Sequence, residues 1–433
     1  MTNERTNERT NERTNERTNE RTNERTNERT NRNTNNSLSL RNLFIGYILC
    51  CSIMIYFLIE IIILGNNEYS SNIGKIMVMI ALMLGLVLYI PSFKFAVMLE
   101  KMINVLSSIF FIAGYEMLLT IKYAERLVVS NDLKVYFRYY LEAKNLSIFE
   151  YVSGGKSKNI GFYILNWLIG RLTDVNLWHY QSIFYLLTVL IFAFLTIRFI
   201  GFKYLFLAVL SFSIFPVTSP IYINILRQGL AMMLVFWGVT EYLYGNRKVS
   251  IFILLISLTF HSTTVVIVLP ALLSLILKIK LRTSLLIWSG FAAMYLTNLS
   301  KPVSIFLNRM IPNDKFDSYS SRIASVGEAD LFNIFLYSTI LIFSGIYICW
   351  RLKQNEDIKF VRLFQVILII NAAFFLFGYI PFSDRMSFYS LLFFPYIIIY
   401  YVAAIGKETY LLPYYLGIIL FSFSHSALTV LFH

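Results

Sequence analysis

Charged residues and cysteines are both scarce in this sequence. Asp, Glu, Lys and Arg together make up 15% of its 433 residues, whereas soluble domains carry about 25%. The three cysteines, Cys50, Cys51 and Cys349, all lie inside apolar runs. Their number and placement provide neither a disulfide framework nor the paired spacing of a zinc site. The sequence also has no Gly-rich phosphate loop and no Ser-His-Asp pattern, so we expect neither a bound metal nor a cofactor.

Hydrophobic residues are abundant instead, at 57% of the chain. Several apolar runs reach about 18 residues or more, which is long enough to cross a bilayer core of about 30 Å. The expected fold class is therefore all-α: a polytopic integral membrane protein with about 12–14 transmembrane helices. A further apolar stretch, residues 160–172, is too short for an upright span and is a candidate re-entrant segment. The expected spans are residues 43–64, 73–90, 103–119, 183–200, 204–219, 223–244, 249–260, 264–277, 284–299, 331–350, 361–380, 387–404 and 411–430.

The first 41 residues form a low-complexity tail that precedes the polytopic domain, residues 43–430. Seven Thr-Asn-Glu-Arg units fill residues 2–29 and then decay. A four-residue period without apolar residues cannot bury a core, so we expect a disordered tail. The codons ACG-AAC-GAA-CGA encode the unit and are also one repeated tetranucleotide, ACGA. Slippage in such a tract would switch the gene on and off, and our hypothesis is phase variation; an ordinary flexible tail is the alternative.

The net charge of +13 is first a topology signal, because Lys and Arg concentrate in short cytoplasmic loops. Every short basic loop falls on one side if the N-terminus is cytoplasmic and residues 249–277 form a broken hairpin. A single span there would reverse everything that follows. With the hairpin, residues 122–182, residues 300–330 and the loop 382–385 lie outside. The two long outward segments are rich in Lys and Arg, as a site for an anionic substrate would be; we expect no nucleic acid partner.

Arg227, His261 and Arg385 fall at this outer face. Arg227, with Gln228 beside it, suits a phosphate clamp, because the guanidinium fork binds phosphate through two bonds. The alternative is an arginine that extends to the membrane interface as an anchor. His261 suits a general base or a hydrogen-bond donor to phosphate or sugar; a helix-end histidine bonded to a carbonyl is the alternative. For Arg385 the alternative is a local salt bridge with Asp384.

A further group of candidates lies in the outward segment 122–182. Asp132 suits a base or a sugar-binding group, although an ordinary solvated loop acid is the alternative. Tyr136 and Arg138 follow it as candidate substrate contacts. Four neighbouring side chains suit stacking on sugar rings or, alternatively, an aromatic belt at the membrane interface: Trp167, Trp178, His179 and Tyr180.

Several short segments combine in one order along the chain. They are Asp132 with Tyr136, Gly161–Asn166, Arg227–Ala231, Tyr242–Lys248, Phe260–Thr263 and Asp384–Tyr389. Together they resemble the EpsG branch of the Wzy-type polysaccharide polymerases over about residues 120–400. One departure is that Asn159 and Ile160 stand where an acidic residue is expected, which increases the reliance on Asp132 or His261 as the base.

The resemblance implies an enzyme of the bacterial cytoplasmic membrane that joins oligosaccharide repeat units carried on undecaprenyl diphosphate. Arg227 and Arg385 would stabilise the leaving diphosphate, His261 or Asp132 would activate the acceptor hydroxyl, and the substrate-binding group would include Gln228, Tyr136 and Arg138. The implied partners are the lipid-linked oligosaccharide, membrane lipid, a chain-length regulator and a flippase. Two other classes stay open: a ligase or another glycosyltransferase on the same carrier, and a flippase or transporter. Transporters often contain internal repeats, and none is visible outside the tail.

Overall fold

The computed structural model describes residues 68–89, 97–125, 131–153, 159–215, 218, 221–222, 224–310, 328–352, 358–379, 384–405, 411, 414 and 417. All of them belong to one unit, residues 53–433. In these ranges the chain is helical and has no strand, which confirms the all-α fold class. The repeat tail 1–41, the expected span 43–64 and most of the span 411–430 lie outside the described residues.

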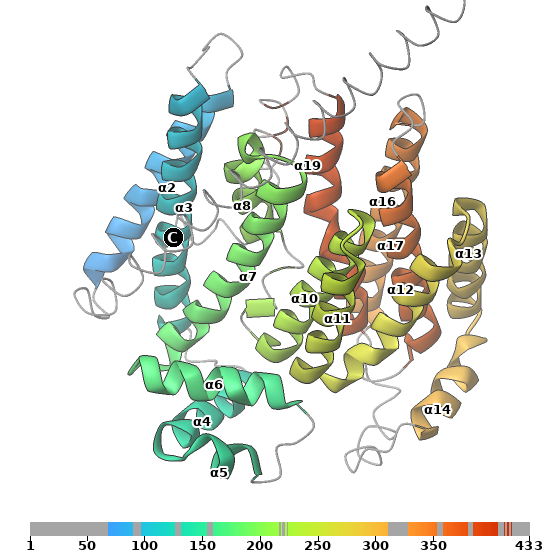
Figure 1. The fold of residues 1–433 in the computed structure, drawn as a ribbon, viewed down its shortest axis with the longest axis horizontal. Helices are drawn as coiled ribbons and strands as arrows, with labels where there is room; N and C mark the ends of the chain where they lie inside the picture. The colour runs from blue at the N-terminus through green and yellow to red at the C-terminus, as the bar shows by residue number, and fades with distance from the viewer. Residues whose placement is uncertain are drawn as a thin grey trace, which may run out of the picture. The chain divides into compact units, whose positions relative to one another are not determined.

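Among the residues that the structure describes, five segments are long and apolar enough to cross a bilayer. They are Val97–Leu119, His179–Phe199, Phe335–Leu352, Ile358–Phe377 and Arg385–Ala404. These segments belong to the helices α3 (Val97–Glu125), α7 (Leu177–Phe199), α16 (Glu328–Leu352), α17 (Ile358–Phe377), and α18 (Asp384–Leu391) with α19 (Phe393–Ile405) (Figure 1). The chain is therefore a multi-pass membrane protein.

Other helices coincide with further expected spans in the described part of the chain. They are α2 (Glu68–Tyr89), η2 with α8 (Phe202–Tyr204 and Leu205–Ile214), α10 (Leu226–Leu243) and α13 (Leu281–Leu296); the helix α14 (Ser300–Met310) lies in the segment expected outside. The segment 249–277 is not one continuous helix. It consists of α11 (Arg247–Phe260), the short helix η3 (Ser262–Thr264) and α12 (Val265–Leu277).

Three helices form a layer beside one end of α7 (Figure 1). They are α4 (Asn131–Asn145), α5 (Ile148–Ser153) and α6 (Ile160–Leu172), and the bounds of α6 match the expected short apolar stretch. A buried cluster joins this layer to α7 and α10: Leu133, Tyr136, Tyr140, Phe162, Ile169, Val175, Tyr180, Phe184, Leu226 and Leu230. Because α4, α6, α7 and α10 share this core, the polar residues at their ends are held close together.

Candidate functional site

Helix α4 presents Asp132 and Tyr136 on one face. The two residues are four positions apart, so they lie one turn apart along the helix. Tyr136 is buried and Asp132 is partly exposed. Leu133 and Tyr140 on the same helix enter the shared core. The apolar residues of α4 therefore fix its rotation, and this rotation turns Asp132 and Tyr136 toward α10.

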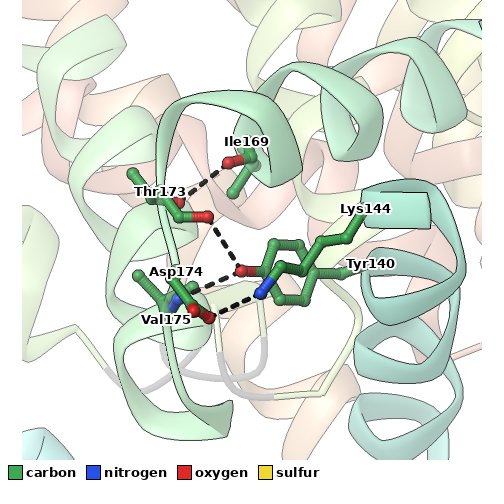
Figure 2. A network of polar contacts seen from close by, with 6 residues as sticks. All are labelled: Tyr140, Lys144, Ile169, Thr173, Asp174 and Val175. Carbon is green, nitrogen blue, oxygen red and sulfur yellow. Dashed lines mark hydrogen bonds and ion pairs between the residues drawn. The ribbon is translucent and has the colours of Figure 1, made fainter.

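A second set of contacts ties the far end of α4 to the connection between α6 and α7 (Figure 2). The Tyr140 hydroxyl donates to the Thr173 carbonyl at 3.1 Å and accepts the Val175 N–H at 3.0 Å. Lys144 Nζ pairs with Asp174 Oδ1 at 2.6 Å on the surface. Backbone groups of an irregular connection need such partners when they are buried. The network thus satisfies the connection and holds α4 in place along its length.

Helix α10 begins with Leu226 and carries Arg227 and Gln228 in its first turn. Leu226 and Leu230 anchor this turn in the shared core. Gly229 lies against Ile221 so closely that an added Cβ would be 2.1 Å from the Ile221 Cγ2 atom. Gly229 therefore allows the preceding chain to pack directly on the first turn, which fixes the position of the two polar side chains.

Arg227 is directed at α4. Its Cζ atom lies 5.8 Å from the centre of the Tyr136 ring, within the distance at which a guanidinium is attracted to an aromatic face. Its Nε atom is buried and has no hydrogen-bond partner among the residues that the structure describes. No Asp or Glu in that part of the chain forms an ion pair with Arg227. Arg227 is thus a cation that is positioned against the Tyr136 ring and has an Nε–H group available to bind a ligand.

Arg385, on α18, joins the same group. Its Nη2 atom lies 3.0 Å from Asp132 Oδ2, although the two residues are 253 positions apart in sequence. Its carbonyl accepts a bond of 3.4 Å from Gln228 Nε2. The Arg385 and Asp132 side chains keep 24% and 40% of their accessible surface, so this ion pair is accessible and of modest strength. Arg385 thus pairs with Asp132 of α4; the Asp384 side chain, its alternative partner, lies outside the described residues.

His261 lies in the break between α11 and α12, outside both helices. Its N–H donates to the Ser257 carbonyl at 3.2 Å, and its carbonyl accepts the Thr264 N–H at 3.0 Å. Burial, reinforced by the charges of Arg227 and Arg385, lowers the pKa of His261 to about 3. The imidazole is therefore neutral at physiological pH. Its Nδ1 atom has no hydrogen-bond partner in the described part of the chain, so the side chain is not bonded to a carbonyl there.

A residue that the sequence analysis did not select supports the break from the other side. Thr264 Oγ1 lies 2.6 Å from the hydroxyl oxygen of Tyr389 on α18. Both residues are buried, so this bond ties the start of α12 to the helix that carries Arg385. Thr264 was missed because a threonine beside a helix break is common, and only the fold shows its partner 125 residues away.

The remaining candidates lie elsewhere. Arg138 is exposed on α4, and because it is two residues beyond Tyr136 it points away from the Asp132 face. Tyr180 is a core residue whose hydroxyl donates to Asn166 Oδ1 at 2.7 Å. The Trp167 indole donates to the Leu146 carbonyl at 3.1 Å. His179 contacts Asn176 Oδ1, and the Trp178 side chain lies outside the described residues. Of the aromatic group, Tyr180 is therefore not accessible for stacking on a sugar.

Six of the candidate residues thus meet where α4, α10, α18 and the α11–α12 break come together. They are Asp132, Tyr136, Arg227, Gln228, His261 and Arg385. Two arginines face one carboxylate and a neutral imidazole, so the group has a net positive charge. Among the described residues no group of three His, Cys, Asp or Glu side chains could hold a metal ion. Such an arrangement can bind an anion through fixed cations and offer a neutral nitrogen beside it.

The fold and this site define a class: a multi-pass helical membrane protein with a cationic polar site where helix ends meet. A comparison with family models identifies the family, because the model described as EpsG family matches residues 109–432. The chain belongs to the EpsG family, whose members are polymerase-type membrane proteins associated with polysaccharide biosynthesis. No curated protein and no solved structure matches the chain.

Proposed function

We propose that this protein is a glycosyltransferase that polymerises a surface polysaccharide at the outer face of the bacterial cytoplasmic membrane, with its N-terminus in the cytoplasm. Its substrates would be oligosaccharide repeat units linked to undecaprenyl diphosphate. The observation that carries this proposal is the convergence of Arg227, Arg385 and neutral His261 on one site. Membership of the EpsG family supports the same reaction class.

The arginines suit the leaving group of this reaction. When the bond between the anomeric carbon and the diphosphate breaks, negative charge grows on the phosphate oxygens. Preorganised cations stabilise such a charge without having to reorganise during the reaction. Arg227 has a buried Nε donor without a partner among the described residues, and Arg385 forms an accessible ion pair with Asp132. A diphosphate can engage the first directly and compete with Asp132 for the second.

His261 suits the acceptor hydroxyl. The hydroxyl oxygen forms the new bond to the anomeric carbon, its proton passes to the imidazole, and the diphosphate leaves with the electron pair of the broken bond. A pKa of about 3 keeps the imidazole neutral, but it also makes the group a weak base. Part of that lowering comes from the charges of Arg227 and Arg385. A bound diphosphate neutralises both, so substrate binding would raise the pKa of His261 and strengthen the base.

The test is the surface glycan of a deletion strain complemented with single variants. Arg227→Ala and His261→Ala should each leave single repeat units in place of a polymer ladder on a gel. Arg282→Ala is the matched control, because Arg282 is an exposed arginine on α13, and it should restore the full ladder. Membrane abundance of every variant is measured alongside.

Other outcomes separate the competing classes. An unchanged ladder in the deletion strain would contradict polymerisation. Full polymer that stays on the carrier lipid would identify a ligase instead. Asp132→Asn distinguishes the two candidate bases: an inactive Asp132→Asn beside an active His261→Ala would assign the base to Asp132.

A further inference from the structure

The side chain of Asn159 connects the α4–α6 layer to the break that carries His261. Asn159 directly precedes α6, at the position where an asparagine commonly caps its own helix. Here its side chain makes no capping bond to α6. Its Oδ1 atom instead accepts the N–H of Ser262 at 3.0 Å, from a residue 103 positions away. The bond that normally stabilises a helix start is thus directed at the residue next to His261.

The approach of α6 to α11 makes this bond possible. At Gly161, the second residue of α6, an added Cβ would lie 2.3 Å from Thr259 Oγ1 and 3.1 Å from the Phe260 ring. At a distance below 3 Å, the Thr259 side chain or one of the two helices would have to shift. Gly161 therefore lets the start of α6 rest on the last turn of α11, and Asn159 comes within reach of the break.

The Asn159 bond completes the backbone hydrogen bonds around His261. The His261 N–H and carbonyl are already bonded to Ser257 and Thr264. The N–H of Ser262 is the first donor of η3 and has no partner within its own short helix, as is usual at a helix start. Asn159 supplies that partner from α6, and Tyr389 holds Thr264 from α18. Hydrogen bonds therefore hold the break between α11 and α12 from both α6 and α18. They restrict the backbone conformation at His261 and so the direction of its imidazole.

We propose that Asn159 is a positioning residue that sets the direction of His261 relative to Arg227 and Asp132. The proposal rests on the proposed function, in which His261 accepts a proton. Asn159 acts through geometry: α6 is packed on α4, which carries Asp132 and Tyr136, so the Asn159–Ser262 bond fixes the distance between the two halves of the site. A misplacement of about 1 Å in such a site costs on the order of 100-fold in rate.

The experiment compares polymer formation from lipid-linked repeat units in membranes that contain each variant. Asn159→Ala removes the acceptor and should reduce the rate about 10- to 100-fold. Asn159→Asp keeps an oxygen acceptor at the same place and should retain most of the activity. Asn145→Ala is the matched control, because Asn145 is an exposed asparagine at the end of α4, and it should match the wild type. Rates are expressed per amount of monodisperse protein extracted from the membrane.

A double variant tests whether Asn159 acts through His261. If it does, Asn159→Ala should add little to the loss caused by His261→Ala, because residues that act as one unit are not additive. An active Asn159→Ala beside an inactive His261→Ala would overturn the positioning role and leave the proposed function standing. An Asn159→Asp variant as slow as Asn159→Ala would also overturn it. An active His261→Ala would overturn both the positioning role and the assignment of His261 as the base.

If Asn159→Ala does not accumulate in the membrane, Asn159→Gln takes its place. Glutamine keeps the amide but moves the carbonyl by one methylene, so the bond to Ser262 cannot form without displacing α6. The expected loss is of the same order, and a fully active Asn159→Gln would contradict the proposal.

Discussion

Helix α10 carries one charged side chain near each end, and the two ends differ in how that charge is satisfied. Near the carboxyl end, Glu241 is only 1% exposed. Its carboxylate accepts bonds from Arg198 Nη2 at 3.1 Å, Asn246 Nδ2 at 2.6 Å and Trp237 Nε1 at 3.1 Å. At the amino end, Arg227 faces the ring of Tyr136, and its buried Nε has no partner in the described part of the chain.

The difference separates a structural network from a binding site. A buried charge is costly unless hydrogen bonds and a counter-charge compensate it. The Glu241 network is complete, so it stabilises the packing of α7 on α10 and has no capacity left for a ligand. The Arg227 end keeps the capacity to bind a ligand. The free-energy cost of its incompletely bonded charge is explained if an anionic substrate supplies the missing hydrogen-bond partners. Helix α10 thus carries a fully bonded charge, Glu241, near its carboxyl end and an incompletely bonded charge, Arg227, at its amino end. We call these the closed end and the open end of α10.

The largest effect on activity is expected at the open end. Arg227→Ala should reduce the polymerisation rate by about 10²- to 10³-fold, because it removes a cation that stabilises the transition-state charge. The amount of folded protein and its thermal midpoint should change little, since the side chain has few bonds to lose. Rate and midpoint are measured on the same detergent-extracted protein. A lowered midpoint with a normal rate per folded molecule would make Arg227 a structural residue.

The closed end, at Glu241, should respond in the opposite way: a substitution there should lower the stability and leave the rate unchanged. Glu241→Ala leaves Arg198 without its carboxylate and should destabilise the protein by about 3 kcal/mol, at the lower end of the range for buried ion pairs because Arg198 is a quarter exposed. The rate per folded molecule should stay near the wild-type value. Thermal unfolding in detergent checks the first expectation and the polymer assay the second. A strong loss of rate at normal stability would end the distinction between the two ends.

Most of the fold, and the residues at the open end, could be predicted from the sequence. Long apolar runs define membrane helices with little ambiguity, and the basic turn at Arg247 placed Arg227 and His261 at a common end of two adjoining helices. Pairing could not be predicted, because it depends on how distant helices pack. Arg385 bonds Asp132, which is 253 positions away in sequence. Asn159 was noticed only as a departure from an expected acid, and its bond to Ser262 requires the contact of α6 with α11.

An intermediate effect is expected on the pH midpoint at which His261 gains a proton when Arg227 is replaced. The imidazole, with a pKa of about 3, should stay neutral from pH 8 down to pH 5, whereas an ordinary histidine gains a proton near pH 6.5. Arg227→Gln removes one of the charges that lower the pKa, so the midpoint should move upward. The chain has four histidines, so histidine-labelled NMR spectra are simple, and His261→Ala assigns the signal. A midpoint near 6.5 in the wild type would show that neither burial nor the charges of Arg227 and Arg385 lower the pKa of His261.

The smallest effect is expected at Glu116, which tests whether lack of a partner is by itself enough to mark a site. Glu116 is buried in α3, and neither carboxylate oxygen has a hydrogen-bond partner among the described residues. Unlike Arg227, it is not accompanied by the arginine, carboxylate and histidine side chains of the proposed site, although its charge acts on His179. Glu116→Gln should therefore leave the polymer ladder unchanged and the thermal midpoint equal or higher, because an ionisable group is removed from an apolar span. A lost ladder at normal abundance would mean that a buried group without partners marks function in this protein even outside the convergence of α4, α10, α18 and the α11–α12 break.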